Sequence, residues 1–266
     1  MTLHYREHGR GDDVLVFLHG GWGYDVYPFD RQTAALGSRY RILIPDRSGY
    51  GRSSRGACFD ADFHRRAAGE TLGLLDALDV QRAVLWGHSD GAVIAALVAL
   101  EAPARVRALI VEAIHFFRVK PRSRAFFETM VHDPERLGAR VCATLAREHG
   151  DPYWRELLQA GGSAWLHLAD EAPTPQADLY EGRLDALTAP ALVLHGARDP
   201  RTEPGELEAL ARALPNAEFR VLADGGHAPH SERDTAAACT AAAITFLAGP
   251  TPTSVGPATA APRRQR

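Results

Sequence analysis

Short apolar runs that alternate with helical patterns are the feature that most restricts the fold of this 266-residue chain. The runs are almost continuous in apolar residues, which is typical of strands that are covered on both faces. They lie at residues 14–20, 40–46, 83–89, 107–114, 191–199 and 218–227. Apolar residues recur at helical spacing within residues 63–80, 91–103 and 205–215. This alternation predicts an α/β fold, a mostly parallel β-sheet with helices on both faces.

The segment from residue 118 to 187 departs from this alternation. It contains no convincing strand, and its pattern indicates several short helices that carry aromatic residues such as Phe126 and Trp165. We expect a small helical cap over the carboxyl edge of the sheet, inserted between two parts of one core, residues 1–117 and 188–248. The tail, residues 249–266, is rich in Pro, Thr and Ala. It is predicted to be disordered because it cannot bury enough apolar surface to order itself.

Charge and composition exclude several classes of function. The formal net charge is −3, which offers no global positive field for nucleic acids or acidic membranes. The polar N-terminus lacks the apolar region of a signal peptide, and the longest apolar stretch is too short to span a bilayer. We therefore expect a cytoplasmic protein. The three cysteines, Cys58, Cys142 and Cys239, have neither disulfide nor metal-ligand spacing, so no metal site is predicted.

A G-x-S-x-G pattern centred on Ser89 lies between a predicted strand and a predicted helix, in the stretch WGHSDGA at residues 86–92. A sharp strand-to-helix turn would lift the serine side chain to the sheet edge, and it requires glycine on either side, here Gly87 and Gly91. A chance serine in a glycine-rich turn is the alternative. Because the pattern has the right context on both sides, we predict that Ser89 is a nucleophile.

A serine nucleophile needs a base, and His227 is the candidate. Two glycines precede it directly after a predicted strand, which suits an exposed loop that reaches the serine. Its neighbours Asp224 and His230 are competitors, and we expect His230 to pack or hydrogen-bond locally. The alternative for any single histidine is a surface or core residue with satisfied hydrogen bonds, and chain order is what favours the catalytic role for His227.

The base in turn needs an acid that fixes its tautomer and stabilises its charged form. Asp199 lies just beyond the strand ALVLHG at residues 191–196, and Glu112, directly after the strand RALIV at residues 107–111, is the alternative. Ser89, Asp199 and His227 follow one another in the serine–acid–histidine order that is expected for this architecture. We therefore favour Asp199.

The fourth requirement is an oxyanion hole, a set of N–H groups aimed at the charge that forms on attack. The stretch LHGGWG at residues 18–23 follows the first long strand, and its glycines let the backbone approach a substrate oxygen closely. We expect the N–H of Gly21, with that of Trp22 as a further donor, to act together with the N–H of Asp90. His19 is expected to brace this loop.

The motifs HGG, PDRSGYGRS, GHSDG, HGARDP and GGH, in this order, resemble those of the α/β-hydrolase superfamily. The resemblance covers residues 5–247. It implies the α/β-hydrolase fold with a helical cap and a Ser-Asp-His triad, and it says little about the substrate, because this scaffold hosts many chemistries. In PDRSGYGRS, Asp46 and Arg47 are expected to hydrogen-bond the backbone.

The side chain of Asp90, next to the nucleophile, has two candidate roles. An acid in the first turn of a helix is favoured by the helix dipole and the free N–H groups there. Alternatively, the carboxylate could bind a cationic amino group of the substrate and hold the acyl carbonyl over Ser89. The elbow GHSDG is similar to that of the valacyclovir-hydrolase-like branch, and this similarity implies the second role.

The function predicted from these parts is a serine hydrolase that cleaves a small-molecule ester, amide or thioester through an acyl-enzyme. It needs no cofactor, because base, acid and oxyanion hole lie in the chain itself. Two alternatives stay open: a lyase, cyclase or acyltransferase on the same scaffold, and a ligand-binding receptor with a hydrolase fold. The expected partner is a small molecule, and the sequence gives no oligomeric state.

Overall fold

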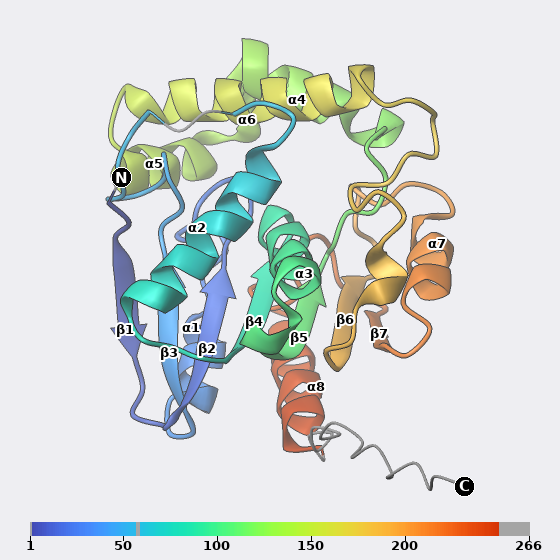
Figure 1. Ribbon diagram of the computed structural model, residues 1–266. Helices are drawn as coiled ribbons and strands as arrows, with labels where there is room; N and C mark the ends of the chain where they lie inside the picture. Colours follow the sequence, from blue (N-terminus) through green and yellow to red (C-terminus); the bar gives the residue numbers. More distant parts are fainter. Residues whose placement is uncertain (1, 57–58, 250–266) are drawn as a thin grey trace, which may run out of the picture.

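The computed structural model describes residues 2–56 and 59–249, and in this part of the chain seven strands form one sheet in the order β1-β3-β2-β4-β5-β6-β7. Every neighbouring pair is parallel except β1 with β3. The strands are β1 (Tyr5–His8), β2 (Asp13–Leu18), β3 (Tyr40–Pro45), β4 (Ala83–His88), β5 (Val106–Glu112), β6 (Ala191–Gly196) and β7 (Glu218–Leu222) (Figure 1). The prediction of a mostly parallel α/β sheet is confirmed.

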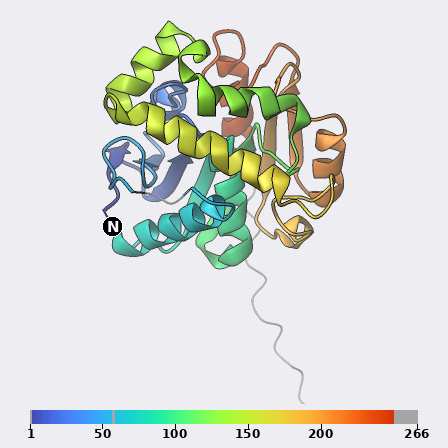
Figure 2. The same ribbon diagram turned by 90° about the horizontal axis from the view of Figure 1, so that it is seen from above.

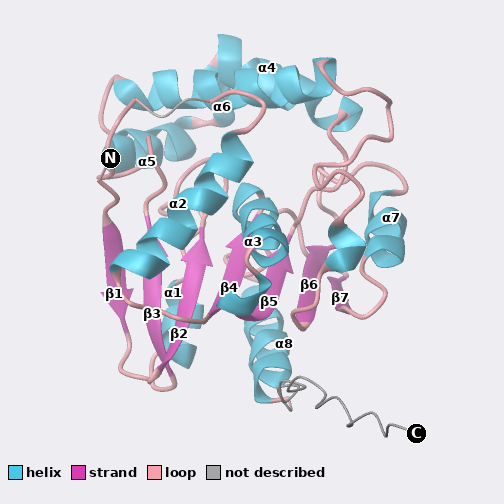
Figure 3. Cartoon of the chain, viewed as in Figure 1, coloured by secondary structure: helices cyan, strands magenta, loops and turns pink. Residues whose placement is uncertain are grey.

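Helices lie in front of the sheet and behind it, as Figure 3 shows. Helices α2, α3 and α7 cover one face, and α1 and α8 cover the other. Their bounds are α1 (Asp30–Leu36), α2 (Phe63–Ala77), α3 (Asp90–Glu101), α7 (Glu206–Ala213) and α8 (Ala236–Ala248). Two short 3₁₀ helices, η1 (Pro103–Arg105) and η3 (Leu184–Ala186), lie in connections.

The core follows the alternation of side chains along the strands. In β4, Leu85 packs with the helices of the first face, whereas Val84 and Trp86 pack with those of the second. Successive side chains of a strand point to opposite faces, so a strand covered on both sides must be apolar throughout. Helix α3, which starts directly after Ser89, is buried along most of its length. A helix that is apolar all round belongs in the interior, and α3 therefore fixes the serine to the rigid centre of the molecule.

A third group of helices lies between β5 and β6 in the chain. They are α4 (Pro121–His132), the 3₁₀ helix η2 (Pro134–Leu137), α5 (Ala139–His149) and α6 (Tyr153–Asp170). Figure 1 shows them beyond the carboxyl ends of the parallel strands, and in the view from above α4 and α6 run side by side across the sheet (Figure 2). We call α4, α5 and α6 the upper helices. Their position allows them to cover any site at the ends of the strands.

Some elements were absent from the prediction, and some bounds differ from it. The edge strand β1 and helix α1 were not predicted, and β7 ends at Leu222, five residues before His227, which lies in the following loop. The tail predicted to be disordered lies outside the described residues from position 250 onward. In residues 2–56 and 59–249, no helix has the length and apolarity that crossing a membrane requires. The cytoplasmic location stays a prediction.

Candidate active site

Ser89 lies at the turn between β4 and α3 in an unusual backbone conformation. Its φ is 54° and its ψ is −121°, a region that non-glycine residues rarely enter and that tends to occur at functional sites. The flanking glycines are required, because a Cβ on Gly87 would lie 2.1 Å from the Gly91 carbonyl oxygen and one on Gly91 would lie 2.0 Å from that of Leu18. The crowded turn therefore presents the serine side chain at the sheet edge.

The structure brings Ser89, His227 and Asp199 together from three separate strand ends. His227 Nε2 lies 3.0 Å from Ser89 Oγ, and its Nδ1 lies 2.9 Å and 3.0 Å from the two carboxylate oxygens of Asp199. The Nε2 of His88, just before the serine, donates to the backbone oxygen of His227 at 2.9 Å. This contact fixes the loop that carries the imidazole, so the ring faces the hydroxyl.

Asp199 is held as a carboxylate. Burial alone would raise its pKa, but His227, together with the backbone N–H of Arg201, lowers the pKa to about 2. A carboxylate that stays charged at neutral pH accepts from imidazole Nδ1–H and leaves Nε2 free to accept a proton from the serine. The three side chains thus have the tautomer and the order that serine activation needs.

The competing acid, Glu112, lies elsewhere. Its carboxylate accepts from Trp86 Nε1 at 3.1 Å and from the backbone N–H and Nδ1 of His230, both at 2.8 Å. All three residues are buried. Glu112 and His230 therefore form an internal pair behind the site, and Asp224, the third competitor, pairs with Arg198 at the surface.

The loop after β2, residues 19–25, lies beside the serine, and we call it the glycine loop. A Cβ on Gly20 would lie 3.1 Å from the Ser89 Cβ, so the loop packs directly on the elbow. In the described chain, the backbone N–H groups of Gly21, Trp22 and Asp90 donate to no carbonyl oxygen. These three residues line the same cavity as Ser89, and an oxyanion hole requires N–H groups aimed at the developing charge. Their role as an oxyanion hole stays a prediction.

His19 and Arg47 brace this loop from below. His19 Nδ1 donates to the Gly20 oxygen at 2.8 Å, and its Nε2 accepts from the Arg47 N–H at 3.2 Å. Burial, with the charge of Arg47, lowers the pKa of His19 well below its usual range. The ring is therefore neutral, so that one nitrogen can donate a hydrogen bond while the other accepts one. The Arg47 guanidinium also donates to the Gly20 oxygen, at 2.8 Å.

The end of helix α5 holds the same loop from above. The Glu148 carboxylate accepts from the backbone N–H groups of Tyr24 and Asp25 at 2.7 and 3.0 Å. His149 Nε2 donates to the Trp22 oxygen at 3.1 Å, and its Nδ1 accepts from Gly51. The loop is thus bound to the core on one side and to the upper helices on the other.

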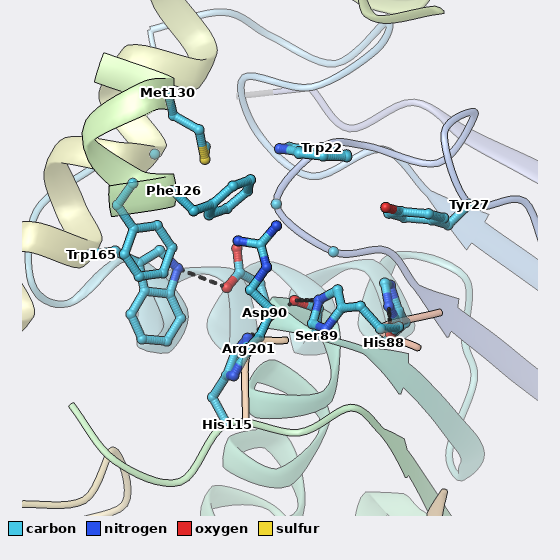
Figure 4. A pocket seen from close by; sticks show the side chains of 15 residues that line it. Trp22, Tyr27, His88, Ser89, Asp90, His115, Phe126, Met130, Trp165 and Arg201 are labelled. Atoms are coloured by element: carbon cyan, nitrogen blue, oxygen red, sulfur yellow. Dashed lines mark hydrogen bonds between the residues drawn. The ribbon is translucent and has the colours of Figure 1, made fainter. Parts of the chain in front are cut away.

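A cavity with a volume of about 50 Å³ opens onto Ser89 and His227. Loop residues line it on one side and residues of the upper helices on the other (Figure 4). Its large apolar and aromatic side chains, histidines aside, are Trp22, Tyr27, Phe126, Phe127, Met130 and Trp165, and His88, His115, Arg201 and His227 also line it. The walls are therefore mostly apolar, and the space has room for only a few water-sized groups.

The Asp90 carboxylate reaches this cavity but binds other side chains of the protein. Its Oδ1 accepts from His64 Nε2 at 3.2 Å and from Trp165 Nε1 at 3.1 Å (Figure 4), and Arg47 lies 3.8 Å from its Oδ2. Burial opposes ionisation, but His64, Arg47 and Trp165 lower the pKa of Asp90 to about 2. These contacts join α3 to α2 and α6. The role as an amine anchor stays a prediction.

Two residues that sequence reasoning did not single out line the cavity, His115 and Arg201. His115 Nε2 lies 3.3 Å from Ser89 Oγ, and burial lowers the pKa of His115 well below its usual range. A neutral imidazole there can donate to Oγ while the serine donates to His227. Both residues follow a predicted strand by a few positions, and this is the one sequence signal that could have found them.

The described residues, 2–56 and 59–249, contain no group of three or more His, Cys, Asp or Glu side chains that could hold a metal ion. Of the three cysteines, Cys239 is buried and Cys142 is partly exposed, and both are free thiols. Cys58 lies outside the described residues.

Comparisons with known proteins find related sequences and structures. A family model described as the alpha/beta hydrolase family matches residues 15–241. Serine hydrolase BPHL from Homo sapiens is 24% identical over 235 residues, 86% of this chain and 78% of its own length. A 2-hydroxy-6-oxononadienedioate/2-hydroxy-6-oxononatrienedioate hydrolase from Paraburkholderia phymatum is 29% identical over 251 residues, 85% of each chain. Among solved structures, a hydrolase from Pseudomonas aeruginosa superposes with a TM-score of 0.70 at 24% identity and covers 93% of this chain and 94% of its own.

Proposed function

Because the chain belongs to the alpha/beta hydrolase family, we propose that it is a serine hydrolase that cleaves a small ester, amide or thioester through an acyl-enzyme. The observation that carries this proposal is the hydrogen-bonded series from Ser89 Oγ through His227 to Asp199, with contacts of 3.0 Å and 2.9 Å. The series starts at a strained elbow, and strain of this kind is retained where it serves a mechanism.

In the first half of the reaction, Ser89 Oγ attacks the carbonyl carbon of the substrate. Its proton passes to His227 Nε2, and Asp199 stabilises the imidazolium that results. The negative charge on the carbonyl oxygen is stabilised by the N–H of Asp90 and by that of Gly21 or Trp22. His227 then gives its proton to the leaving group as the carbon–leaving-group bond breaks, which leaves the acyl group on Oγ.

In the second half, a water molecule attacks the acyl carbon. His227 takes one proton from this water, and the same N–H groups stabilise the second oxyanion. The ester bond to Oγ then breaks, the proton returns to Oγ, and a carboxylic acid leaves. Water is the only co-reactant that this sequence of steps consumes.

Residues 118–187 act in this proposal as a cap over the reacting groups. The upper helices contribute Phe126, Met130 and Trp165 to the cavity wall, and apolar walls strengthen each electrostatic interaction within them by excluding water. The small cavity favours compact acyl or leaving groups. The two similar proteins, a serine hydrolase and a 2-hydroxy-6-oxononadienedioate/2-hydroxy-6-oxononatrienedioate hydrolase, support hydrolytic chemistry on a small molecule.

The test is covalent labelling of the intact protein with a fluorophosphonate, followed by mass analysis. We expect wild type to gain one adduct, on Ser89, and Ser89→Ala to gain none and to lose at least about 10³-fold in ester turnover. Ser163→Ala, at an exposed position of α6, is the matched control and should behave as wild type.

Labelling of Ser89 and turnover in ¹⁸O-labelled water together separate the alternative functions. A ligand-binding receptor without hydrolytic chemistry would leave Ser89 unlabelled. A lyase or cyclase would turn over without placing oxygen from ¹⁸O-labelled water in the carboxylic acid product. Unlabelled Ser89, or turnover without label in the product, would each overturn the hydrolase proposal.

A further inference from the structure

The cavity beside Ser89 contains a guanidinium group that has no anionic partner in the described chain. Arg201 follows the candidate acid Asp199 by two residues and lines the same cavity as Ser89 and His227. Figure 4 shows its side chain directed toward Phe126, and the guanidinium lies over that ring. Its Nη1 is buried and has no hydrogen-bond partner among residues 2–56 and 59–249.

The anion closest to Arg201 in sequence is already engaged. Both oxygens of Asp199 bind His227, and the contact between Asp199 and Arg201 is made by the Arg201 backbone N–H. The Phe126 ring offers a cation–π contact, which stabilises less than a buried carboxylate partner would. Burial lowers the pKa of Arg201 to about 10, and the Tyr27 hydroxyl and the Asp199 carboxylate oppose this only in part. The group still carries its charge at neutral pH.

The other charged groups near the cavity are paired within the protein. Asp90 binds His64 and Trp165 and lies near Arg47. Deeper in the same region, Lys120 is paired with Glu206 at 2.6 Å. Among the described residues that line the cavity, Arg201 therefore supplies a positive charge that forms no salt bridge. A buried cation without a partner is costly, and it is expected where a ligand provides the anion.

We propose that Arg201 binds a carboxylate group of the substrate, so that the enzyme acts on short esters or amides that carry a free carboxylate. This inference rests on the proposed function and specifies its substrate class. A guanidinium is suited to the task because its planar N–H groups can bind both oxygens of a carboxylate. Since Ser89 and Arg201 line one cavity of about 50 Å³, the carboxylate lies only a few bonds from the carbonyl that is attacked.

The kinetic test compares two esters of the same size that differ in charge, monomethyl glutarate and its amide, methyl glutaramate. A second pair, 4-acetoxybenzoate and 4-acetoxybenzamide, differs in charge in the same way, but the carboxylate lies on the leaving group instead of the acyl group. We expect wild type to prefer the carboxylate member of at least one pair by ten-fold or more in kcat/KM. Arg201→Met should lose kcat/KM on the carboxylate member and retain it on the neutral member, so that the preference disappears. Arg201→Lys should keep part of the preference.

Arg198→Met is the matched control, because Arg198 lies in the same loop, pairs with Asp224 and is 70% exposed. It should retain the wild-type preference, and far-UV circular dichroism should show that all variants are folded. Equal kcat/KM for both members of both pairs in wild type would overturn the proposal. So would a preference that survives in Arg201→Met.

A binding measurement distinguishes failure of this inference from failure of the proposed function. Monomethyl glutarate should raise the Tm of Ser89→Ala, which cannot form the acyl-enzyme, and should leave the Tm of Ser89→Ala/Arg201→Met unchanged. A Tm shift that needs Arg201, without turnover of any ester, would support the carboxylate site and refute hydrolysis. Ser89-dependent turnover of the neutral esters, without a charge preference or a Tm shift, would refute the carboxylate site alone.

Discussion

At the scale of single residues, the roles of the two acids at the strand ends can be separated by matched amide substitutions. Asp199→Asn would offer His227 Nδ1 a donor where it now finds a carboxylate, which favours the wrong tautomer. We expect kcat to fall by about 10⁴-fold, as for the equivalent change in other serine triads. The measurement is kcat on a neutral ester for both Asp199→Asn and Glu112→Gln.

Glu112→Gln should leave kcat per folded molecule close to wild type. It should instead lower the free energy of unfolding by about 1–3 kcal/mol, because the buried groups of Trp86 and His230 lose a charged acceptor. Urea unfolding measures this loss. A large fall in kcat for Glu112→Gln, together with near-normal activity of Asp199→Asn, would transfer the acid role to Glu112.

Several candidate site residues can be predicted from the sequence because each lies at a strand end or shortly after it. Ser89 and Asp199 follow apolar runs, and parallel strands bring such positions to one edge. The partners of the Asp90 side chain, in contrast, cannot be predicted in this way. Its carboxylate binds His64 of α2 and Trp165 of α6, and only the packing of three helices brings these partners together. No local sequence pattern predicts that these three side chains lie in contact.

At the scale of elements, the contact between α5 and the glycine loop is predicted to make stability depend on pH. Burial raises the pKa of Glu148 to about 7, and the backbone donors of Tyr24 and Asp25 oppose this rise only in part. Asp25 raises the pKa further, Arg6 lowers it, and His149 Nε2 lies 3.7 Å from the carboxylate. The folded chain therefore holds this proton to higher pH than the unfolded chain, whose Glu titrates near 4.5.

Between these two values the folded state binds more protons than the unfolded state, so Glu148 stabilises less as pH rises. Its contribution is complete below about pH 4.5 and is lost as pH passes through about 7. In Glu148→Gln this titration is absent. We expect the Tm of wild type minus that of Glu148→Gln to decrease between pH 5 and pH 8, measured by thermal unfolding at matched ionic strength.

Glu156→Gln, at an exposed position of α6, serves as the control, and its difference from wild type should not vary over the same pH range. A difference between wild type and Glu148→Gln that stays constant with pH would show that the carboxyl group does not titrate there. The contact of Glu148 with the glycine loop would then contribute to stability without any dependence on pH.

Among the elements, the strands buried on both faces were predictable, whereas the edge strand β1 and the short helix α1 were not. The central strands are continuous apolar runs, and such runs indicate strands that are covered on both faces. Strand β1, with the sequence YREH, is half exposed and pairs on one side only. Its strand conformation depends on β3, which follows about thirty residues later. Helix α1 is only seven residues long, too short for a helical period to stand out.

At the scale of the whole molecule, the upper helices are joined to the core by buried polar contacts at separate places. Glu148 and His149 bind the glycine loop, Trp165 binds Asp90, and Lys120 binds Glu206. Polar groups buried in this way need their partners in fixed positions. The positions of the cavity walls are thereby tied to the position of Ser89. We therefore expect the upper helices and the core to unfold in one cooperative step.

The pair Lys120–Glu206 offers the strongest test of this coupling. Lys120 Nζ lies 2.7 and 2.6 Å from the two Glu206 oxygens, and the side chains are 1% and 2% exposed. Glu206 begins α7 of the core, and Lys120 directly precedes α4. Lys120→Met would leave the Glu206 carboxylate buried without a counter-charge. We expect the free energy of unfolding, measured in urea, to fall by about 3–5 kcal/mol.

The double variant Lys120→Met/Glu206→Gln should recover part of this loss, because a neutral amide needs no counter-charge and still accepts from the Phe116 N–H, which now donates to Glu206 at 2.8 Å. Arg124→Met on α4 is the control, since its pair with Glu128 is about half exposed and should contribute less than about 1 kcal/mol. If the double variant is no more stable than Lys120→Met, charge pairing is not what holds this junction. If tryptophan fluorescence and far-UV circular dichroism give separate transitions in wild type, the upper helices unfold independently of the core.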